Sequence, residues 1–259
     1  MKKQKTALVT GATGGLGAHF ANELAKAGYD LLLVGRNEEK LEHLQHLFTT
    51  IYPVQVHTLQ KDLSEPGAGK EVFAFAQENE LTVEVLVNNA GFGDFGAFAF
   101  SDWKKQQDMV MVNCTALLEL TRCFLLPMLT RRSGKILNVA SMASFQPGPL
   151  MSVYYATKAF VLSFTEALSV ELRGTGVTVT ALCPGPTKTG FEKNAALGSS
   201  GLFRNLGVAK AKDVAKYGLK KLRQGKVIAV PGCKNRMIVR ACKVLPRGFV
   251  RNMVYEIQK

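Results

Sequence analysis

Short runs of apolar, often β-branched residues alternate with longer amphipathic segments as far as residue 230. The short runs are typical of buried strands, and the longer segments, with apolar residues every three or four positions, are typical of helices. The predicted strands are Thr6–Thr10, Asp30–Val34, Pro53–Leu59, Val83–Val87, Lys135–Ala140, Val177–Leu182 and Lys226–Val230. The predicted helices are Leu16–Gly28, Glu38–Thr49, Glu65–Asn79, Asp102–Arg131, Val153–Arg173 and Ala211–Gln224.

This alternation predicts an α/β fold, a Rossmann-like doubly wound parallel sheet of about seven strands with helices on both faces. The predicted strands are almost entirely apolar, as expected where both faces of a sheet are covered, and right-handed crossovers connect such strands. Ligands of these folds bind at the carboxyl ends of the strands. Chemically active side chains are therefore expected directly after the predicted strands.

The charge of the chain is concentrated near its end. The 259 residues carry a net charge of +13, yet residues 1–200 hold 18 basic and 18 acidic side chains, whereas residues 201–259 hold 15 basic and 2 acidic ones. This distribution argues against a nucleic-acid-binding protein and indicates a neutral body, residues 1–200, that carries a basic end. We expect a catalytic NADP(H)-binding domain over residues 1–233 and a basic amphipathic tail over residues 234–259.

In the tail, basic residues recur every three or four positions beside an apolar face, and Pro246 and Gly248 divide it into two short helices. The interpretation we favour is that the apolar face packs on the domain or on a second subunit, with the basic side chains in solvent. The alternatives are peripheral contact with an anionic membrane and binding of an acidic carrier such as coenzyme A or acyl carrier protein. The basic positions are Arg236, Arg240, Lys243, Arg247 and Arg251, and the apolar ones are Met237, Ile238, Ala241, Val244 and Leu245.

The sequence pattern contains no evident targeting segment or metal site. The apolar run near the start, Ala7–Val9, is shorter than a signal peptide requires, and no uncharged stretch has the character of a membrane span. A cytoplasmic location is therefore expected. The five cysteines form no CxxC pair and are expected to be reduced, and the four scattered histidines complete no ligand set.

A glycine-rich turn, TGATGGLG at Thr10–Gly17, joins the first predicted strand to the first predicted helix. Gly11 allows a tight turn, Gly15 lets the backbone approach a pyrophosphate, and Gly17 permits close packing of helix on strand. The start of the helix supplies amide donors and the positive end of its dipole. In this strand–turn–helix context the glycines predict a dinucleotide site.

The residue after the second predicted strand bears on which dinucleotide is bound. Gly35 and Arg36 occupy the place where an acidic residue would select NAD. A guanidinium can pair with a 2′-phosphate and stack on adenine, so NADP(H) is expected. The alternative is that Arg36 is an ordinary solvated charge at the start of a helix.

Three side chains form a candidate acid–base centre. Tyr154 and Lys158 are four residues apart in a predicted helix and share one face. A neighbouring ammonium group is expected to lower the tyrosine pKa, which is ordinarily near 10. Ser141 follows the fifth predicted strand, and the loop after it can bring its hydroxyl to the same substrate oxygen.

Over roughly residues 5–230 the chain resembles the short-chain dehydrogenase/reductase family. The resemblance implies that Tyr154 is the acid–base, that Lys158 binds the nicotinamide ribose and lowers the tyrosine pKa, and that Ser141 polarises the carbonyl. It also implies that Asn113 holds a water in a proton relay. The motifs that carry the resemblance are TGATGGLG, Asp62-Leu63, NNAG at Asn88–Gly91, Asn113, Ser141, YYATK at Tyr154–Lys158 and PGPTKT at Pro184–Thr189.

The resemblance further implies which residues contact the cofactor. Two positions depart from the family pattern: Thr13 and Gly14 stand where many NADPH-dependent members have a basic residue, and Thr187 replaces a usual aliphatic residue. The 2′-phosphate assignment therefore rests on Arg36 alone. The implied cofactor-binding residues are Thr10, Gly11, Thr13, Gly14, Gly15, Leu16, Gly17, Arg36, Asp62, Leu63, Asn89, Ala90, Gly91, Tyr154, Lys158, Pro184, Gly185, Thr187 and Thr189.

These features predict an NADP-dependent oxidoreductase that reduces a carbonyl, such as a ketone or a 3-oxoacyl group, with hydride from the cofactor and a proton from Tyr154. The alternatives are a catalytically idle NADP(H)-binding sensor or membrane tether, and a nucleotide-sugar epimerase or dehydratase, although the last 59 residues do not resemble the substrate domain of those enzymes. A homodimer or homotetramer is expected.

Several apolar side chains predict a pocket for a fairly apolar substrate. They follow NNAG, precede Tyr154, or belong to a predicted substrate flap at residues 184–207, for which an irregular loop is the alternative. For the phenylalanines after NNAG, plain core packing is an equal alternative. The candidate pocket residues are Phe92, Phe95, Phe98, Phe100, Leu150, Met151, Phe191 and Leu202.

Overall fold

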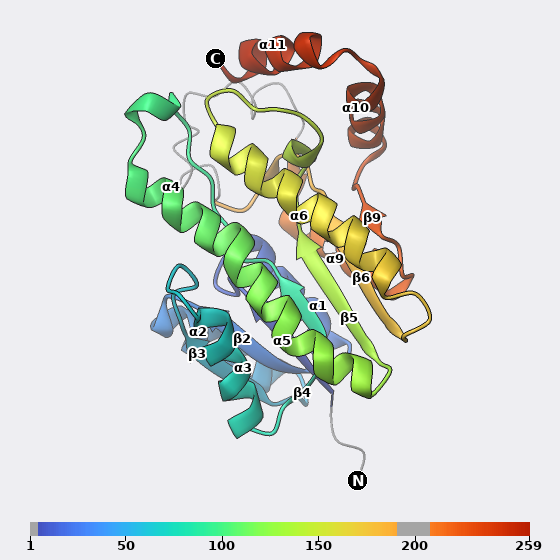
Figure 1. Ribbon diagram of the computed structural model, residues 1–259. Coiled ribbons are helices and arrows are strands. Elements are labelled where there is room, and N and C mark those ends of the chain that lie inside the picture. Colours follow the sequence, from blue (N-terminus) through green and yellow to red (C-terminus); the bar gives the residue numbers. More distant parts are fainter. Residues whose placement is uncertain (1–4, 191–207) are drawn as a thin grey trace.

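The computed structural model describes residues 5–190 and 208–259 and has the predicted α/β architecture (Figure 1). Seven parallel strands form one sheet in the order β3-β2-β1-β4-β5-β6-β9. The order reverses between β1 and β4, which is where ligands bind in doubly wound sheets. The strands are β1 Lys5–Thr10, β2 Asp30–Gly35, β3 Val56–Gln60, β4 Thr82–Asn88, β5 Gly134–Val139, β6 Val177–Leu182 and β9 Ile228–Ala229.

Helices cover both faces of the sheet. One face carries α1 (Gly15–Lys26), α2 (Glu38–Ile51) and α9 (Ala211–Arg223), and the other carries α3 (Ala68–Glu78), α5 (Leu117–Thr130) and α6 (Ser152–Glu171). The remaining helical elements are α4 (Trp103–Val110), a π-helical turn (Met111–Ala116), two 3₁₀ turns (Phe98–Phe100 and Met142–Phe145), α10 (Cys233–Val244) and α11 (Arg247–Gln258).

The central strand β1 shows why the chain folds into these layers. Ala7 and Val9 pack against the helices of one face, whereas Leu8 packs against those of the other, and all three side chains are fully buried. Burying a side chain such as Leu8 contributes about 1.5–3 kcal/mol. An apolar strand in this position is therefore stabilised from both sides.

Some element ends differ from the predictions for identifiable reasons. β3 begins at Val56 rather than Pro53, and proline has no N–H to donate to a neighbouring strand. α3 begins at Ala68 rather than Glu65 because its N-cap, Gly67, has a left-handed backbone with φ of 80°. The helix predicted over 102–131 contains the π-helical turn.

The helix Trp103–Thr130 is, within the described ranges, the single one long and apolar enough to span a bilayer by length and composition. In its most apolar window 44% of the residues are buried inside the fold. Leu120, Phe124 and Met128 on this helix pack against the sheet.

The tail forms two helices, as predicted, and packs on the domain (Figure 1). Val250 and Val254 of α11 are buried against Tyr155 and its neighbours. The predicted apolar face of α10 is wrong in part, because the buried residue on this helix is Val239. Met237 and Val244, which we placed on that face, are 68% and 85% exposed.

Short strands flank the segment predicted as a flap. β7 (Thr187–Lys188) pairs in parallel with β8 (Ala209–Lys210). Residues 191–207, which include the candidate pocket residues Phe191 and Leu202, lie outside the described part of the chain.

Candidate active site

All of the predicted site residues lie at the carboxyl edge of the sheet or on the helices that pack beside it. The glycine turn follows β1, Arg36 follows β2, and Asp62 and Leu63 follow β3. The remaining groups are Asn89–Gly91 after β4, Ser141 after β5, Pro184–Thr189 after β6, Asn113 in the π-helical turn, and Tyr154 and Lys158 in α6.

The glycine turn is fixed to the end of β4 by hydrogen bonds. The Asn89 side-chain amide donates to the Thr10 carbonyl at 2.8 Å and to the Gly11 carbonyl at 3.2 Å. The Thr10 hydroxyl accepts from the backbone N–H groups of Asn89 and Ala90, both at 3.0 Å. Gly11 has a φ of 61°, which favours glycine, and a Cβ on Gly17 would overlap the Gly11 carbonyl.

This turn fits the pyrophosphate of a dinucleotide. α1 begins at Gly15, and its N-cap residue is Gly14. Because glycine has no side chain, no N-cap side chain accepts from the N–H groups of the first turn, which can therefore donate to a phosphate. A Cβ on Gly15 would lie 2.8 Å from the Thr189 carbonyl oxygen. The segment after β6 therefore lies directly against the glycine turn, where both can contact one cofactor.

Arg36 and Asp62 lie together at the expected adenosine end. The Arg36 guanidinium is 3.8 Å from the Asp62 carboxylate, and its side chain is 74% exposed. Burial would raise the pKa of Asp62, but hydrogen bonds from Ser64 and the Arg36 charge outweigh it and lower the pKa. Leu63 is buried in the core. An exposed guanidinium after β2 fits a 2′-phosphate.

Ser141 is the N-cap of the 3₁₀ turn Met142–Phe145. Its hydroxyl oxygen accepts from the backbone N–H of Ala143 at 3.1 Å, and it also hydrogen-bonds to Tyr154. The Ser144 hydroxyl accepts from the Ser141 N–H at 3.3 Å and donates to the Lys158 carbonyl at 2.7 Å. Ser144 thus connects the Ser141 turn to α6. Our sequence reasoning missed Ser144, although Ser-x-x-Ser after a strand is a variant of the capping box.

Lys158 is buried beside the end of β5. Its ammonium group donates to the Val139 carbonyl at 2.8 Å and lies 5.9 Å from the centre of the Tyr154 ring. A Cβ on Gly91 would come within 3.2 Å of Lys158 Nζ, so the loop after β4 approaches this lysine closely. Burial lowers the pKa of Lys158 to about 8.

The pKa of Tyr154 is raised to about 12, mainly by burial, and the hydrogen bond with Ser141 opposes this only in part. This is opposite to the lowering expected from the neighbouring Lys158. The physical reason is that removing the phenolate from water costs more than the nearby donor returns. Tyr154 is therefore held as the protonated phenol, the form that can donate a proton.

The Asn113 side chain is fully engaged within the protein. Its Oδ1 accepts from the Phe92 N–H at 3.1 Å, and its Nδ2 donates to the Phe92 carbonyl and the Thr157 hydroxyl, both at 3.0 Å. These contacts fix the loop after β4 to α6. The water expected on Asn113 stays a prediction; the residue lies in the π-helical turn, and such turns are frequent at functional sites.

The predicted apolar pocket is only partly assembled among the described residues. Phe95 packs on a cluster that contains Met151 and Tyr155, next to Tyr154. In contrast, Phe98 and Phe100 are 55% and 92% exposed and do not contribute to this cluster. The backbone geometry explains the split, since Phe98–Phe100 forms a separate 3₁₀ turn.

The tail contributes a wall to this cluster, which the sequence did not indicate. The Gln258 side-chain amide is fully buried and donates to the Tyr155 hydroxyl at 2.7 Å. Val250 and Val254 complete the apolar surroundings of Tyr155. Tyr155 is therefore a packing residue of this cluster, and its ring lies edge-on to that of Tyr154.

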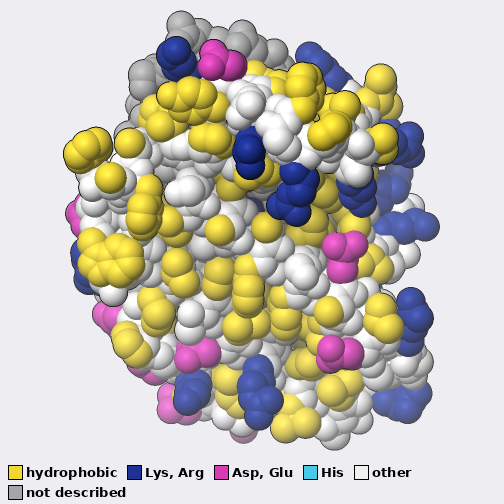
Figure 2. Space-filling view, turned by 45° about the horizontal axis from the view of Figure 1, so that its top comes forward, with side chains coloured by type: hydrophobic (Ala, Val, Ile, Leu, Met, Phe, Trp, Pro, Cys, Tyr) yellow, Lys and Arg dark blue, Asp and Glu magenta, His cyan; other side chains and the backbone are white. Residues whose placement is uncertain are grey.

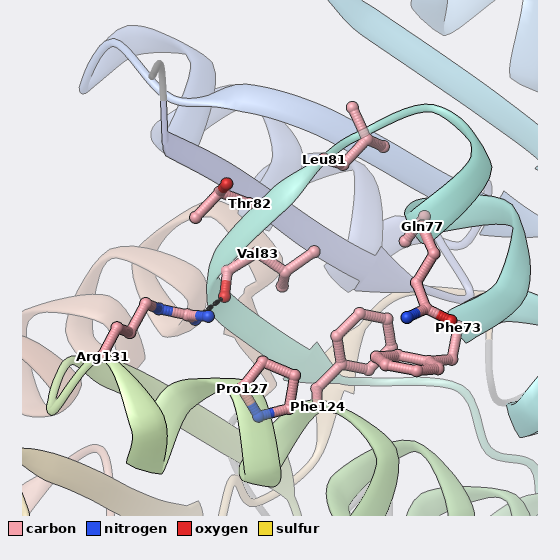
Figure 3. A pocket seen from close by; sticks show the side chains of 9 residues that line it. Phe73, Gln77, Leu81, Thr82, Val83, Phe124, Pro127 and Arg131 are labelled. Carbon is pink, nitrogen blue, oxygen red and sulfur yellow. Dashed lines mark hydrogen bonds between the residues drawn. The ribbon is translucent and has the colours of Figure 1, made fainter. Parts of the chain in front are cut away.

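Two cavities lie outside the catalytic cluster. A groove of about 640 Å³ runs between α4, α5 and α6 and is lined by apolar residues such as Phe98, Val110 and Phe160. A smaller cavity of about 200 Å³ lies between α3 and α5, where Arg131 donates to the Val83 carbonyl and Phe73 packs edge-on against Phe124 (Figure 3). This smaller cavity opens at the start of β4, the opposite end of the sheet from Tyr154. Among the residues that the structure describes, no cluster of three potential metal ligands is found.

Comparison with known proteins identifies the family. Residues 5–199 match the short chain dehydrogenase family. The chain is 34% identical over 182 residues to a 7beta-hydroxysteroid dehydrogenase of Collinsella aerofaciens, covering 70% of this chain and 68% of that protein. It is 37% identical over 180 residues to a very-long-chain 3-oxoacyl-CoA reductase of Laccaria bicolor, covering 69% of this chain but only 53% of the reductase.

Solved structures give the same result over nearly the full length. A short-chain dehydrogenase from Sphingobium yanoikuyae in complex with NADPH superimposes with a TM-score of 0.82 at 28% identity, covering 98% of this chain and 97% of that one. A family member from Burkholderia phymatum in complex with NAD has a TM-score of 0.82 at 25% identity, with 93% and 94% covered. The chain belongs to the short-chain dehydrogenases, oxidoreductases that use a nicotinamide cofactor.

Proposed function

We propose that this protein is an NADP(H)-dependent reductase that converts an apolar ketone or 3-oxoacyl compound into the alcohol. The observation that carries the proposal is the arrangement of Ser141, Tyr154 and Lys158 at one edge of the sheet. The same residues serve the reverse oxidation, so the proposed direction follows from the proposed use of NADPH, whose cellular pool is usually kept reduced.

The bound nicotinamide supplies a hydride to the carbonyl carbon. As the carbon–oxygen π electrons move to the oxygen, Tyr154 gives its phenolic proton to that oxygen. Ser141 has its oxygen occupied by the Ala143 N–H and can donate its own proton to the same developing charge. The ammonium of Lys158 stabilises the phenolate that Tyr154 becomes, which is then reprotonated from solvent.

The preference for NADP(H) rests on Arg36. Its exposed guanidinium stands directly after β2, where an acidic residue would select NAD, and it lies 3.8 Å from the Asp62 carboxylate. The solved relatives include both an NADPH and an NAD complex, so the local residues decide. We expect Arg36→Asp to reverse the ratio of kcat/KM for NADPH and NADH, while Lys40→Asp, at an exposed position four residues on, leaves the ratio unchanged.

The substrate is proposed to be apolar because Phe95, Met151, Tyr155 and Val250 form one apolar cluster that packs beside Tyr154. Relatives named as a hydroxysteroid dehydrogenase and a 3-oxoacyl-CoA reductase suggest two classes to test. The screen follows NADPH oxidation with oxosteroids, 3-oxoacyl thioesters of coenzyme A and of acyl carrier protein, and small polar ketones. Turnover restricted to the polar ketones would contradict the apolar pocket.

The mechanism is tested by Tyr154→Phe, with Tyr155→Phe as the matched control. Loss of the proton donor should lower kcat about 10²–10⁴-fold, while NADPH binding, followed by fluorescence, stays nearly intact. Tyr155→Phe removes a neighbouring hydroxyl and should retain most of the turnover. Tight NADPH binding without turnover of any carbonyl in the screen would instead support an idle sensor or tether.

We further propose that the protein is cytoplasmic and self-associates as a homodimer or homotetramer. Apolar side chains on α5 and α6 stay exposed, Leu126 at 70% and Val170 at 51%, and Phe160, at 41%, lines the 640 Å³ groove between the same helices. Hydrophobic side chains run across the middle of this face in Figure 2. A monomer rarely exposes such a surface, and an apolar face can pair with its own copy without repulsion.

A further inference from the structure

The corner between α10 and α11 exposes apolar and basic side chains together. Leu245 is 36% and Phe249 57% exposed, and with Val244 they lie within three residues of the turn at Pro246. The exposed Met237 lies two helical turns before Val244 on the same helix. Lys and Arg side chains gather along the upper right border of Figure 2, where α10 lies in Figure 1. We call this surface the tail tip; it consists of Met237, Val244, Leu245 and Phe249 with Arg240, Lys243, Arg247 and Arg251.

The geometry of α10 explains why these side chains face outward. Val239 is the buried residue of the helix, with Cys242 half-buried on the same side, where its thiol hydrogen-bonds to Gln146. Met237, Arg240 and Val244 are spaced three and four residues apart and therefore share the opposite face. The helix is thus anchored by one side and presents the other to its surroundings.

The charge of the tail tip is uncompensated. Residues 233–259 hold seven basic side chains and one acidic one, Glu256. Within the described parts of the chain, no salt bridge involves any of the basic residues of the tip. The Lys243 ammonium lies 5.7 Å from the centre of the Phe145 ring. An aromatic ring attracts the cation but does not neutralise its charge.

We propose that the tail tip is a docking surface for an anionic lipid membrane. Exposed aliphatic and aromatic side chains ringed by Lys and Arg are the combination that inserts into the headgroup region of a charged bilayer. A second copy of the chain does not fit, because it would bring the same positive charges against the tip. A nucleic acid would engage the basic residues and leave four apolar side chains in water.

Docking through the tail tip would place the active site close to the lipid. The tail that carries the tip also supplies Val250, Val254 and Gln258 to the cluster around Tyr155, next to Tyr154. An apolar substrate could then enter from the bilayer surface instead of crossing water. The docking itself does not depend on the proposed reductase activity, since its readout is binding.

The test is co-sedimentation of the full chain with vesicles of phosphatidylcholine alone and with vesicles containing about one third phosphatidylserine. We expect binding only to the anionic vesicles and a decrease with salt. Each basic residue contributes about a fivefold change in partitioning, so Arg240→Gln with Arg247→Gln should weaken binding roughly 25-fold. Phe249→Ser with Val244→Ser should weaken it about tenfold or more and leave the salt dependence in place.

The matched control is Lys212→Gln with Lys220→Gln, which removes two exposed charges from α9. All variants keep Val239, Val250 and Val254, and unchanged melting temperatures will show that the tail stays packed. The proposal is overturned if the full chain ignores anionic vesicles, or if the α9 control weakens binding as much as the tip variants. It is also overturned if free coenzyme A displaces the protein, which would identify the tip as a site for an acidic carrier.

Discussion

Replacing Lys158 by methionine should abolish the chemistry and yet stabilise the fold near neutral pH. The ammonium group is buried, and burial lowers its pKa from the ordinary 10.5 to about 8. A difference of about 2.5 pKa units corresponds to roughly 3 kcal/mol of stability that the charged lysine costs at pH 7. The variant also removes the donor to the Val139 carbonyl at 2.8 Å, which costs about 1–3 kcal/mol at any pH.

The pH dependence separates these two effects. Between pH 8 and 10.5 the unfolded chain binds the lysine proton more tightly than the folded chain, so the wild-type protein gains stability as the pH rises. The stability advantage of Lys158→Met over wild type should therefore shrink by about 2.5 kcal/mol from pH 7 to pH 10. Burial raises the pKa of the neighbouring thiols, Cys114 to about 11 and Cys183 to about 12, so neither ionises in the folded protein within this range.

The assay is urea unfolding followed by circular dichroism at several pH values in the absence of cofactor. Lys212→Met, on the exposed side of α9, controls for the loss of a surface charge. The reasoning is refuted if the difference between Lys158→Met and wild type is independent of pH, or if it grows toward high pH. Turnover should be nearly lost in the same variant, since no cation then stabilises the phenolate.

Other contacts give further expectations. Ser144→Ala should lower kcat about fivefold, because the Lys158 carbonyl loses a hydrogen bond of about 1 kcal/mol. Ser144→Thr keeps a hydroxyl and should restore part of the rate. An unchanged kcat in Ser144→Ala would mean that the turn holds its shape without this hydroxyl. Gln258→Leu should lower the free energy of unfolding by about 1–2 kcal/mol, because the Tyr155 hydroxyl loses its partner. The double variant Gln258→Leu with Tyr155→Phe removes both partners and should unfold with nearly the wild-type free energy. If the losses of the two single variants add up in urea unfolding, the pairing is contradicted. Leu126→Glu should convert the assembly to monomers in light scattering, and an unchanged mass would remove α5 from the interface.

Periodicity and motif position were sufficient for most of the fold and the site. The strands of this sheet are apolar on both faces, so their positions stand out in the sequence, and the residues after them lie at one edge by topology alone. The pKa of Tyr154 could not be predicted in the same way, because the burial that raises it depends on elements far away in the chain. The same holds for the contact of Gln258 with Tyr155, which are 103 positions apart.

Local hydrogen bonding limited the prediction in a different way. The Ser144 hydroxyl donates to the Lys158 carbonyl and the Asn113 amide to the Phe92 carbonyl; any residue type supplies a carbonyl, so no side-chain pattern marks these two partners. The exposed positions of Phe98 and Phe100 depend on where the chain turns after NNAG. Sequence therefore located the reacting groups better than the residues that hold them in place.

The pairing of β7 with β8 has a consequence for how this enzyme can evolve. Thr187 is in register with Ala209, and the Ala209 N–H donates to the Pro186 carbonyl at 2.9 Å, so the chain leaves and rejoins the domain at nearly the same point. Insertions, deletions or recombination after Gly190 and before Val208 can therefore change the intervening sequence while β7 and β8 stay paired. The length and composition of that segment can thereby drift while the glycine turn, Tyr154 and Lys158 are inherited unchanged.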